Sequence, residues 1–227
     1  MTETNESKIL YHSPTIRSWK DEGHFHIPEV TYRGQTGTYR LFEQMTSALN
    51  QEQLAEFYEM EKQKGNPVPT DAPLIWAIAE SAYNIKNNSP QEAEKLRQFL
   101  RQGMRKYPNT LTRVAYIPEG NDKILHNYRT SDEYSIENEV VGPDGWMTDI
   151  PDKNVLEFLI GTRDVPQINN VSQWINETNA YLWRRNSKPK ERVERVARFD
   201  GDGNRLGLLC DRNPLVVYPA FLVLKVE

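Results

Sequence analysis

Near the end of the chain, acidic and amide side chains recur at every second position, a spacing that could hold a calcium ion. Asp200, Asp202 and Asn204 carry this alternation. A calcium loop of the EF-hand type also needs Gly at its sixth position and a bidentate Glu at its twelfth. Arg205 and Asp211 stand there instead. The Asp-Gly and Gly-Asn pairs favour a hairpin turn, because Gly accepts a positive φ, so we predict a turn and no metal.

The histidines and the cysteine offer two other kinds of chemistry. His24 and His26 stand two residues apart and would share one face of a strand, where they could bind zinc. Zinc needs three or four ligands, and no cysteine lies near them, so we predict a pair of surface histidines. Cys210 is the one cysteine and ends the apolar run "LGLLC", which predicts a buried thiol rather than a reactive one. We expect no cofactor.

Residues 183–198, "WRRNSKPKERVERVAR", form a locally basic segment. It holds seven Arg or Lys side chains and two Glu side chains, a net charge of +5. With Tyr181 and Trp183 beside it, the segment could contact phosphates and stack a base. The alternative is a strand whose exposed face is charged. The whole chain carries a net charge of −4, which argues against binding nucleic acid through bulk positive charge.

The elements that would position these residues change character along the chain. Residues 38–107 show helical spacing of apolar side chains, and the first of four expected helices covers residues 38–49. Asn50, Asp71 and Ser89 stand where N-caps of the next three helices are expected. The glycines of "YRGQTGTYRLF" predict a turn into the first helix, or a loop that holds an anion at its N-terminus.

After Pro108 the chain becomes rich in β-formers. Short runs such as "TLTRVAYIP", "KILHNYR" and "NRLGLLC" predict strands, and residues 153–162 and 165–177 return to helical spacing. Helices early and strands late indicate an α+β fold with an antiparallel, β-rich C-terminal half. We expect one domain over residues 1–227, with 38–107 as its helical part and 108–227 as its β-rich part.

Composition sets the class of protein. The 227 residues are 37% hydrophobic and have a mean hydropathy of −0.74, yet 5 Trp, 11 Tyr and 7 Phe supply bulky core material. The chain has no apolar run long enough to span a membrane, and its N-terminus lacks the apolar core of a signal peptide. We therefore expect a soluble protein, cytoplasmic or carried on a viral particle.

The end of the chain resembles a known family. "RVARF", a turn, short strands, "RNP" and the terminal "PAFLVLKV" resemble the close of C-type-lectin-like domains of the formylglycine-generating-enzyme type. The same shape recurs in the variable proteins of diversity-generating retroelements. The resemblance covers residues 193–226. Ala220 and Phe221 match the family's Gly-Phe, whereas Leu222 replaces its Arg, and Asp-Gly-Asp-Gly replaces its Gly-Gly-Ser-Trp motif.

The resemblance implies a scaffold for binding rather than an enzyme. The paired catalytic cysteines of formylglycine-generating enzymes are missing, because Cys210 is alone. The variable proteins of the family bind ligands through a hypervariable C-terminal region, which here would cover about residues 200–219. The partner would be a protein or surface ligand of unknown identity, with nucleic acid the less favoured partner.

Alternation of side chains gives a separate argument for a binding surface. If Leu206, Leu208 and Cys210 face inward, their neighbours face outward, and apolar residues in the following loop would form an unusual exposed patch. A buried core position for residues 215–217 is the alternative. The predicted ligand-facing residues are Asp202, Asn204, Gly207, Leu209, Asp211, Asn213, Leu215, Val216, Val217 and Tyr218. The predicted core residues are Trp183, Val193, Ala197, Phe199, Leu206, Leu208, Ala220, Phe221 and Val223.

Overall fold

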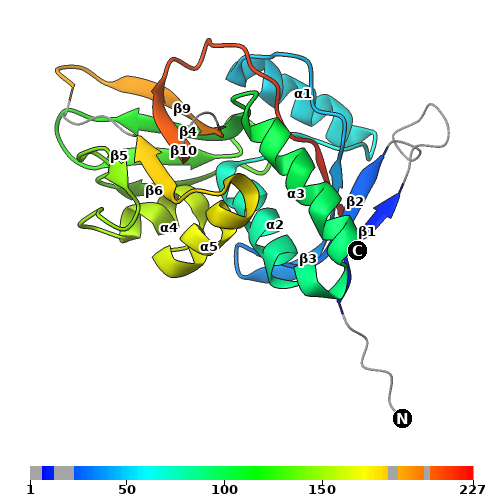
Figure 1. The fold of residues 1–227 in the computed structure, drawn as a ribbon. Helices are drawn as coiled ribbons and strands as arrows, with labels where there is room; N and C mark the ends of the chain where they lie inside the picture. The colour runs from blue at the N-terminus through cyan, green and yellow to red at the C-terminus, as the bar shows by residue number, and fades with distance from the viewer. Residues whose placement is uncertain (1–6, 13–22, 184–188, 202–204, 227) are drawn as a thin grey trace.

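Two β-sheets and five α-helices make up the part of the chain that the structure describes (Figure 1). The structure is a computed structural model, and it describes residues 7–12, 23–183, 189–201 and 205–226. The fold is therefore α+β, as the sequence predicts. Among the described residues, no helix combines the length and apolar character that crossing a membrane would require.

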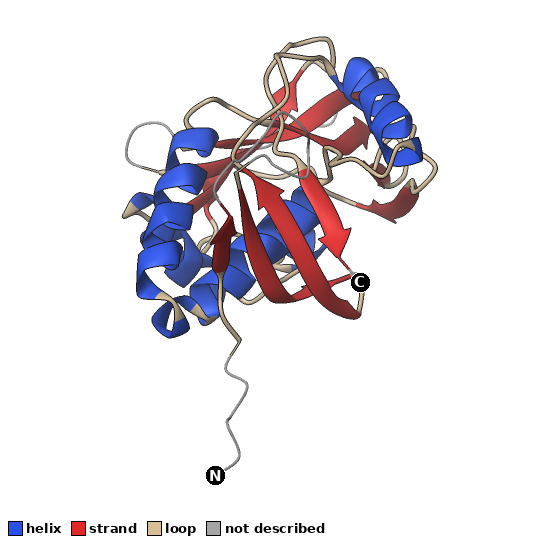
Figure 2. Cartoon of the chain, turned by 90° about the vertical axis from the view of Figure 1, so that its right-hand side faces the viewer, coloured by secondary structure: helices blue, strands red, loops and turns tan. Residues whose placement is uncertain are grey.

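The smaller sheet joins the two ends of the chain (Figure 2). Its strands are all antiparallel to their neighbours. In spatial order they are β1 (Leu10–His12), β2 (His24–Tyr32), β3 (Gln35–Phe42) and β11 (Val223–Val226). Arg33 and Gly34 form the two-residue turn between β2 and β3, with φ of 52° and 71°. This left-handed pair suits the twist of a tight hairpin.

The prediction of a helix over residues 38–49 is wrong. Its first five residues belong to β3, and the "YRGQTG" glycines lie in a hairpin and not before a helix. Tyr39 and Leu41 are both buried, one strand period apart, and β3 is hydrogen-bonded to β2 on one side and β11 on the other. The partners on both sides outweigh a local spacing that suits a helix equally well.

The next three helices form where the sequence predicts them. They are α1 (Gln51–Gln63), α2 (Ala72–Asn84) and α3 (Pro90–Met104), with the short 3-10 helix η1 (Lys86–Asn88) before the last. Asn50 caps α1 in a full capping box with Gln53, and Asp71 accepts a hydrogen bond from the Leu74 N–H at the start of α2. Ser89 stands at the N-cap position of α3 as expected, but its side chain makes no capping hydrogen bond. Pro90 at the first helical position begins α3 instead.

The larger sheet holds the β-rich half of the chain. In spatial order its strands are β6 (Tyr134–Asn138), β5 (Asp122–His126), β4 (Asn109–Tyr116), β9 (Val193–Asp200), β10 (Leu206–Arg212), β8 (Ala180–Trp183) and β7 (Gly145–Trp146). Strands β9 and β10 pair antiparallel, as expected for a hairpin. Strands β8 and β10 run parallel, which the prediction of an antiparallel half missed. Pairing follows position in space, and β10 lies between β9 and β8.

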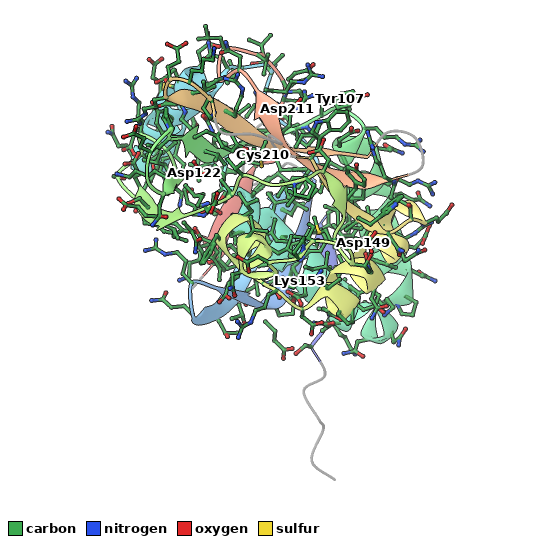
Figure 3. All side chains as sticks on the ribbon, turned by 90° about the vertical axis from the view of Figure 1, so that its left-hand side faces the viewer. Tyr107, Asp122, Asp149, Lys153, Cys210 and Asp211 are labelled. Atoms are coloured by element: carbon green, nitrogen blue, oxygen red, sulfur yellow. The ribbon has the colours of Figure 1, made fainter. Side chains whose placement is uncertain are left out.

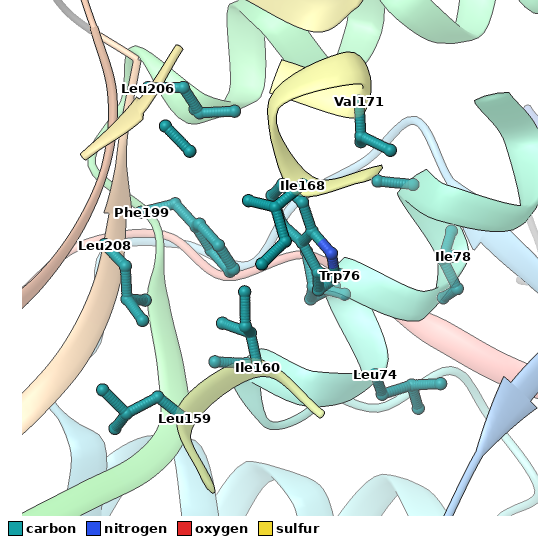
Figure 4. Packing of buried hydrophobic residues seen from close by; sticks show 14 of the residues in the cluster. Leu74, Trp76, Ile78, Leu159, Ile160, Ile168, Val171, Phe199, Leu206 and Leu208 are labelled. Atoms are coloured by element: carbon teal, nitrogen blue, oxygen red, sulfur yellow. The ribbon is translucent and has the colours of Figure 1, made fainter. Parts of the chain in front are cut away.

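The main hydrophobic core includes residues of both sheets and of α2, α3 and two later helices, and Figure 4 shows the part of it between the larger sheet and three helices. These are α2, α4 (Asn154–Ile160) and α5 (Val165–Asn176). Trp76 of α2 stacks on Phe199 of β9, with ring centroids 6.5 Å apart. Buried residues from both halves of the chain share this cluster. The inward positions predicted for Leu206, Leu208 and Cys210 are confirmed.

Most of the predicted core residues are buried. Ala197, Phe199, Leu206, Leu208, Ala220, Phe221 and Val223 are confirmed. The prediction that Trp183 is a core residue is wrong, because this last residue of β8 is 36% exposed. Val193 is only partly buried. Phe221 lies so close to α3 that a Cβ added to Gly103 would stand 2.5 Å from its ring. Gly103 is therefore the residue that lets the C-terminal segment approach α3.

Candidate functional site

The backbone of the segment after β10 is hydrogen-bonded to two other parts of the chain. The Gln51 N–H donates to the Pro214 carbonyl (3.2 Å), and Leu49 and Tyr218 exchange hydrogen bonds of 3.0 and 3.2 Å. The Asn109 side chain donates to the Val216 carbonyl (3.0 Å). These bonds come from the start of α1 and the start of β4. The path of the segment is therefore set by groups outside it.

Its side chains are far less covered than its backbone. Leu215 is 67% exposed and Val217 is 53% exposed, so the alternative of a buried core is wrong for both. Asn213 is exposed, and its Oδ1 accepts from the Leu215 N–H (2.9 Å), which shapes the turn. Asp211, Val216 and Tyr218 are half-buried. We call Asp211, Asn213 and Leu215–Tyr218 the C-terminal surface.

Four of the predicted ligand-facing residues do not belong to this surface. Asp202 and Asn204 lie outside the described residues. Gly207 and Leu209 are buried, Leu209 to 5% exposure, so their predicted exposure is wrong. Leu209 stands opposite Arg198 in the β9–β10 register, and side chains of opposite residues share a face of the sheet. The face of the sheet that carries Leu209 and Arg198 is therefore covered. The prediction from side-chain alternation treats this face as exposed to solvent.

Arg198 lies buried beneath the C-terminal surface. It is 2% exposed, and its guanidinium carbon lies 4.7 Å from the ring centre of Tyr218 and 5.3 Å from that of Tyr107. Among the described residues, its Nε and Nη1 have no hydrogen-bond partner. Figure 3 labels Tyr107 and Asp211 at the same end of the molecule. The two tyrosine faces thus provide the contacts that stabilise this charge.

The basic segment is only partly available for phosphate. Residues 184–188 lie outside the described residues. Arg192 pairs with Glu194 at 2.7 Å, and Arg195 donates to the Glu194 carbonyl. Arg198 is buried, so it does not belong to a charged exposed face.

An aromatic patch remains at the edge of the larger sheet. Trp146 and Trp183 are exposed, Trp146 packs edge-on against Tyr181, and Arg205 lies over the rings of Tyr181 and Trp183. Of the two predicted stacking residues, Trp183 is thus exposed and Tyr181 is half-buried, with Arg205 beside both.

The histidine pair differs from the prediction in its exposure. His24 is buried and packs against Phe42, with ring centroids 5.2 Å apart, whereas His26 is half-buried. A pair of surface histidines is therefore wrong, because β1 and β3 flank β2 on both sides. The described residues contain no group of three His, Cys, Asp or Glu that could hold a metal ion.

A cavity of about 460 Å³ lies between the smaller sheet and the residues that follow β5. Its lining combines aromatic, amide and charged side chains from β2, β3, β11, α1 and that loop, among them Tyr32, Arg33, Tyr39, Tyr58, Asn127, Asp132 and Lys225. A second cavity of about 270 Å³ shares Tyr32 and Arg33 with the first. The hairpin turn between β2 and β3 therefore contributes to both.

A buried network of hydroxyls centres on Asp71 beside these cavities. Tyr32 donates to Asp71 Oδ2 at 2.6 Å and Tyr134 donates to the same oxygen at 3.3 Å. Burial and the Asp71 carboxylate raise the pKa of the Tyr32 hydroxyl far above its ordinary value. Burial likewise raises the pKa of Tyr134. Both hydroxyls therefore stay protonated and act as donors to Asp71 at neutral pH.

His126 packs on the Tyr134 ring of this network, with ring centroids 4.8 Å apart. Its Nε2 lies 2.9 Å from the Phe158 carbonyl, which can only accept, so Nε2 carries the proton. Its Nδ1 then accepts from the Thr112 hydroxyl at 2.9 Å. Burial lowers the pKa of His126, so the neutral ring is favoured. Sequence reasoning missed this network, because its members come from distant elements and Asp71 stood out only as a helix cap.

No family model, curated protein or solved structure matches the chain. Any assignment of its function therefore depends on the geometry, burial and charge of the C-terminal surface, the aromatic patch and the cavities.

Proposed function

We propose that the chain is a non-enzymatic binding protein whose C-terminal surface contacts a partner protein. The observation that carries the proposal is the contrast within one segment. Leu215 and Val217 are exposed apolar side chains, whereas the backbone around them is tied to Leu49, Gln51 and Asn109. Exposed apolar side chains on a fixed backbone suit recognition, because little ordering entropy is lost when a partner binds.

The charges and rings of the surface narrow the kind of partner. Tyr218 offers a wide contact area with little rotamer freedom to lose. Arg198 beneath it is buried without an ion pair among the described residues, and a buried charge attracts an opposite charge through a low dielectric. We therefore propose a partner whose contact residues include Asp or Glu beside apolar side chains.

A finer proposal concerns the origin of the surface. The resemblance of residues 193–226 to variable proteins of diversity-generating retroelements supports a C-type-lectin-like scaffold with diversified residues at about 200–219. The neighbouring DNA offers a direct check. A near-copy of the codons for these residues that differs mainly at adenines, beside a reverse transcriptase gene, supports diversification. The absence of both would rule it out.

The binding proposal can be tested with a random peptide library selected on the immobilised full chain. Selected peptides are then measured against the wild type and the Leu215→Ser/Val217→Ser variant. The matched control is Leu10→Ser/Met60→Ser, which changes two half-exposed apolar residues elsewhere. We expect binding to weaken at least about tenfold, or about 1.4 kcal/mol, in the first variant and to stay unchanged in the control. Peptides that depend equally on the control residues would contradict the proposal.

A second candidate is binding of single-stranded nucleic acid at the edge of β8. The observation in its favour is the aromatic patch of exposed Trp146 and Trp183 around half-buried Tyr181, whose rings could stack bases. Quenching of tryptophan fluorescence by a single-stranded oligonucleotide at low salt, with loss of affinity as salt rises, would favour it. No quenching at low salt would exclude it. Pairing of Arg192 with Glu194 makes it the weaker candidate.

A further inference from the structure

The larger cavity lies apart from the C-terminal surface, and its charges are unbalanced. Arg33 and Lys225 are both exposed, line the cavity and form no ion pair with the described residues. Asp132 also lines it, but Lys62 binds this carboxylate at 2.7 Å and Tyr58 donates a hydrogen bond to it. Of the charged groups that line this cavity in the described chain, Arg33 and Lys225 thus have no ion-pair partner, although the Arg33 guanidinium lies over the Tyr134 ring, 4.1 Å from its centroid.

Asn127 lines the same cavity, and one of its polar atoms is buried without a partner among the described residues. The Tyr32 hydroxyl donates its one hydrogen to Asp71. Toward Asn127 it can therefore only accept, and Asn127 Nδ2 donates to it at 3.3 Å. This fixes the orientation of the amide and leaves Asn127 Oδ1 buried without a partner among the described residues. Asn127 also has a positive φ of 49°. Leaving a buried acceptor unpaired costs about 1–3 kcal/mol, so Asn127 is an energetically costly residue of this lining.

The remaining lining suits the carbon skeleton of a small polar molecule. The rings of Tyr39 and Tyr58 and the side chains of Val68, Leu74 and Val223 contribute to it. A cavity of about 460 Å³ falls in the usual range for small-ligand sites, roughly 300–1,000 Å³. Flat aromatic faces pack against the C–H groups of a sugar ring, while the polar groups fix its orientation.

We propose that this cavity binds a small hydroxylated organic anion, either a sugar acid or a sugar phosphate. The anionic group pairs with Arg33 and Lys225, and the carbon skeleton of the ligand packs against the rings of Tyr39 and Tyr58. Carboxylate and phosphate share this chemistry, because both accept hydrogen bonds from guanidinium and ammonium groups. The site is independent of the proposed partner surface, since no residue of that surface lines the cavity.

Calorimetric titration of the full chain with three probes tests the ligand class. The probes are glucuronate, glucose 6-phosphate and neutral glucose. We expect at least one anion to bind at least tenfold more tightly than glucose, and its binding to weaken as NaCl rises from about 0.02 M to about 0.3 M, because exposed charges are screened. The anion that binds more tightly identifies the group. Equal binding of glucose, or no binding of either anion at millimolar concentration, would overturn the proposal.

Variants of the two cations test the location. Arg33→Asn/Lys225→Gln removes both charges and keeps the turn, because Asn-Gly is the preferred pair for a two-residue hairpin. The control Arg105→Asn/Lys106→Gln removes two exposed cations that do not line the cavity. We expect at least tenfold weaker anion binding in the first variant, with an unchanged melting temperature, and wild-type binding in the control. Equal losses in both variants would mean diffuse electrostatic attraction and would overturn the assigned site.

Discussion

Arg198 is the single residue whose surroundings conflict most clearly with its charge. It is buried between Tyr107 and Tyr218, and its Nε and Nη1 have no hydrogen-bond partner among the described residues. Burying a charge without a partner costs several kcal/mol, whereas cation–π contacts return about 0.5–2 kcal/mol. A charge held at such a cost beside an exposed surface is consistent with a role in binding.

We predict that Arg198→Met raises the free energy of unfolding by about 1–2 kcal/mol, because the flexible methionine keeps the packing of the stem and removes the buried charge. Urea denaturation of the variant and the wild type measures the change. The same variant should bind peptides selected on the C-terminal surface less tightly. A loss of stability above about 1 kcal/mol would instead show that the guanidinium is compensated in the folded protein.

His126 makes the stability depend on pH. Burial lowers its pKa in the folded protein, so on acidification the unfolded chain takes up the proton first, near the ordinary value of about 6.5. We predict that the free energy of unfolding falls by up to about 1.4 kcal/mol for each pH unit between that value and the lower pKa of the folded protein. Urea unfolding at several pH values between about 7.5 and 5 measures the slope, and His126→Gln should make it shallower by up to one proton. If the wild type and His126→Gln show the same dependence of unfolding free energy on pH, His126 is not the titrating group.

Two helices begin in chemically different ways, and the difference can be measured. Asn50 accepts from the Gln53 N–H at 2.9 Å, whereas the Ser89 side chain makes no cap at α3. We predict that Asn50→Ala lowers the free energy of unfolding by about 1 kcal/mol. Ser89→Ala, the matched control, should change it by less than about 0.5 kcal/mol. Comparable losses in urea denaturation would show that Ser89 caps α3 in solution.

For the molecule as a whole, Phe221 connects the end of the chain to the core. Its ring packs edge-on against Phe99 with centroids 5.7 Å apart, and the space for it depends on Gly103. We predict that Phe221→Ala lowers the free energy of unfolding by about 3–5 kcal/mol, the cost of an unfilled cavity. Val217→Ala, at an exposed position of the same segment, should cost less than about 0.5 kcal/mol. A small loss for Phe221→Ala in thermal or urea unfolding would show that β11 is peripheral.

Local chemistry was sufficient to predict the elements that depend on neighbouring residues. Asn50 and Asp71 cap helices because a cap needs only a side chain and an N–H two or three residues away. The strands of the β-rich half and the inward side chains of β10 follow from short-range composition and alternation. The exposure of Leu215 and Val217 was one of two alternatives that the sequence left open, and the structure decided between them.

Only the tertiary structure decided the features that depend on distant partners. Residues 38–42 form a strand because β2 and β11 offer hydrogen bonds on both sides, which helical spacing within one segment cannot reveal. Leu209 and Arg198 are buried because the second face of the larger sheet is covered. The cavity beside Asn127 assembles side chains from residues 32 to 225. Pattern along a chain reports local preference, whereas burial and shared cavities depend on which distant segments meet.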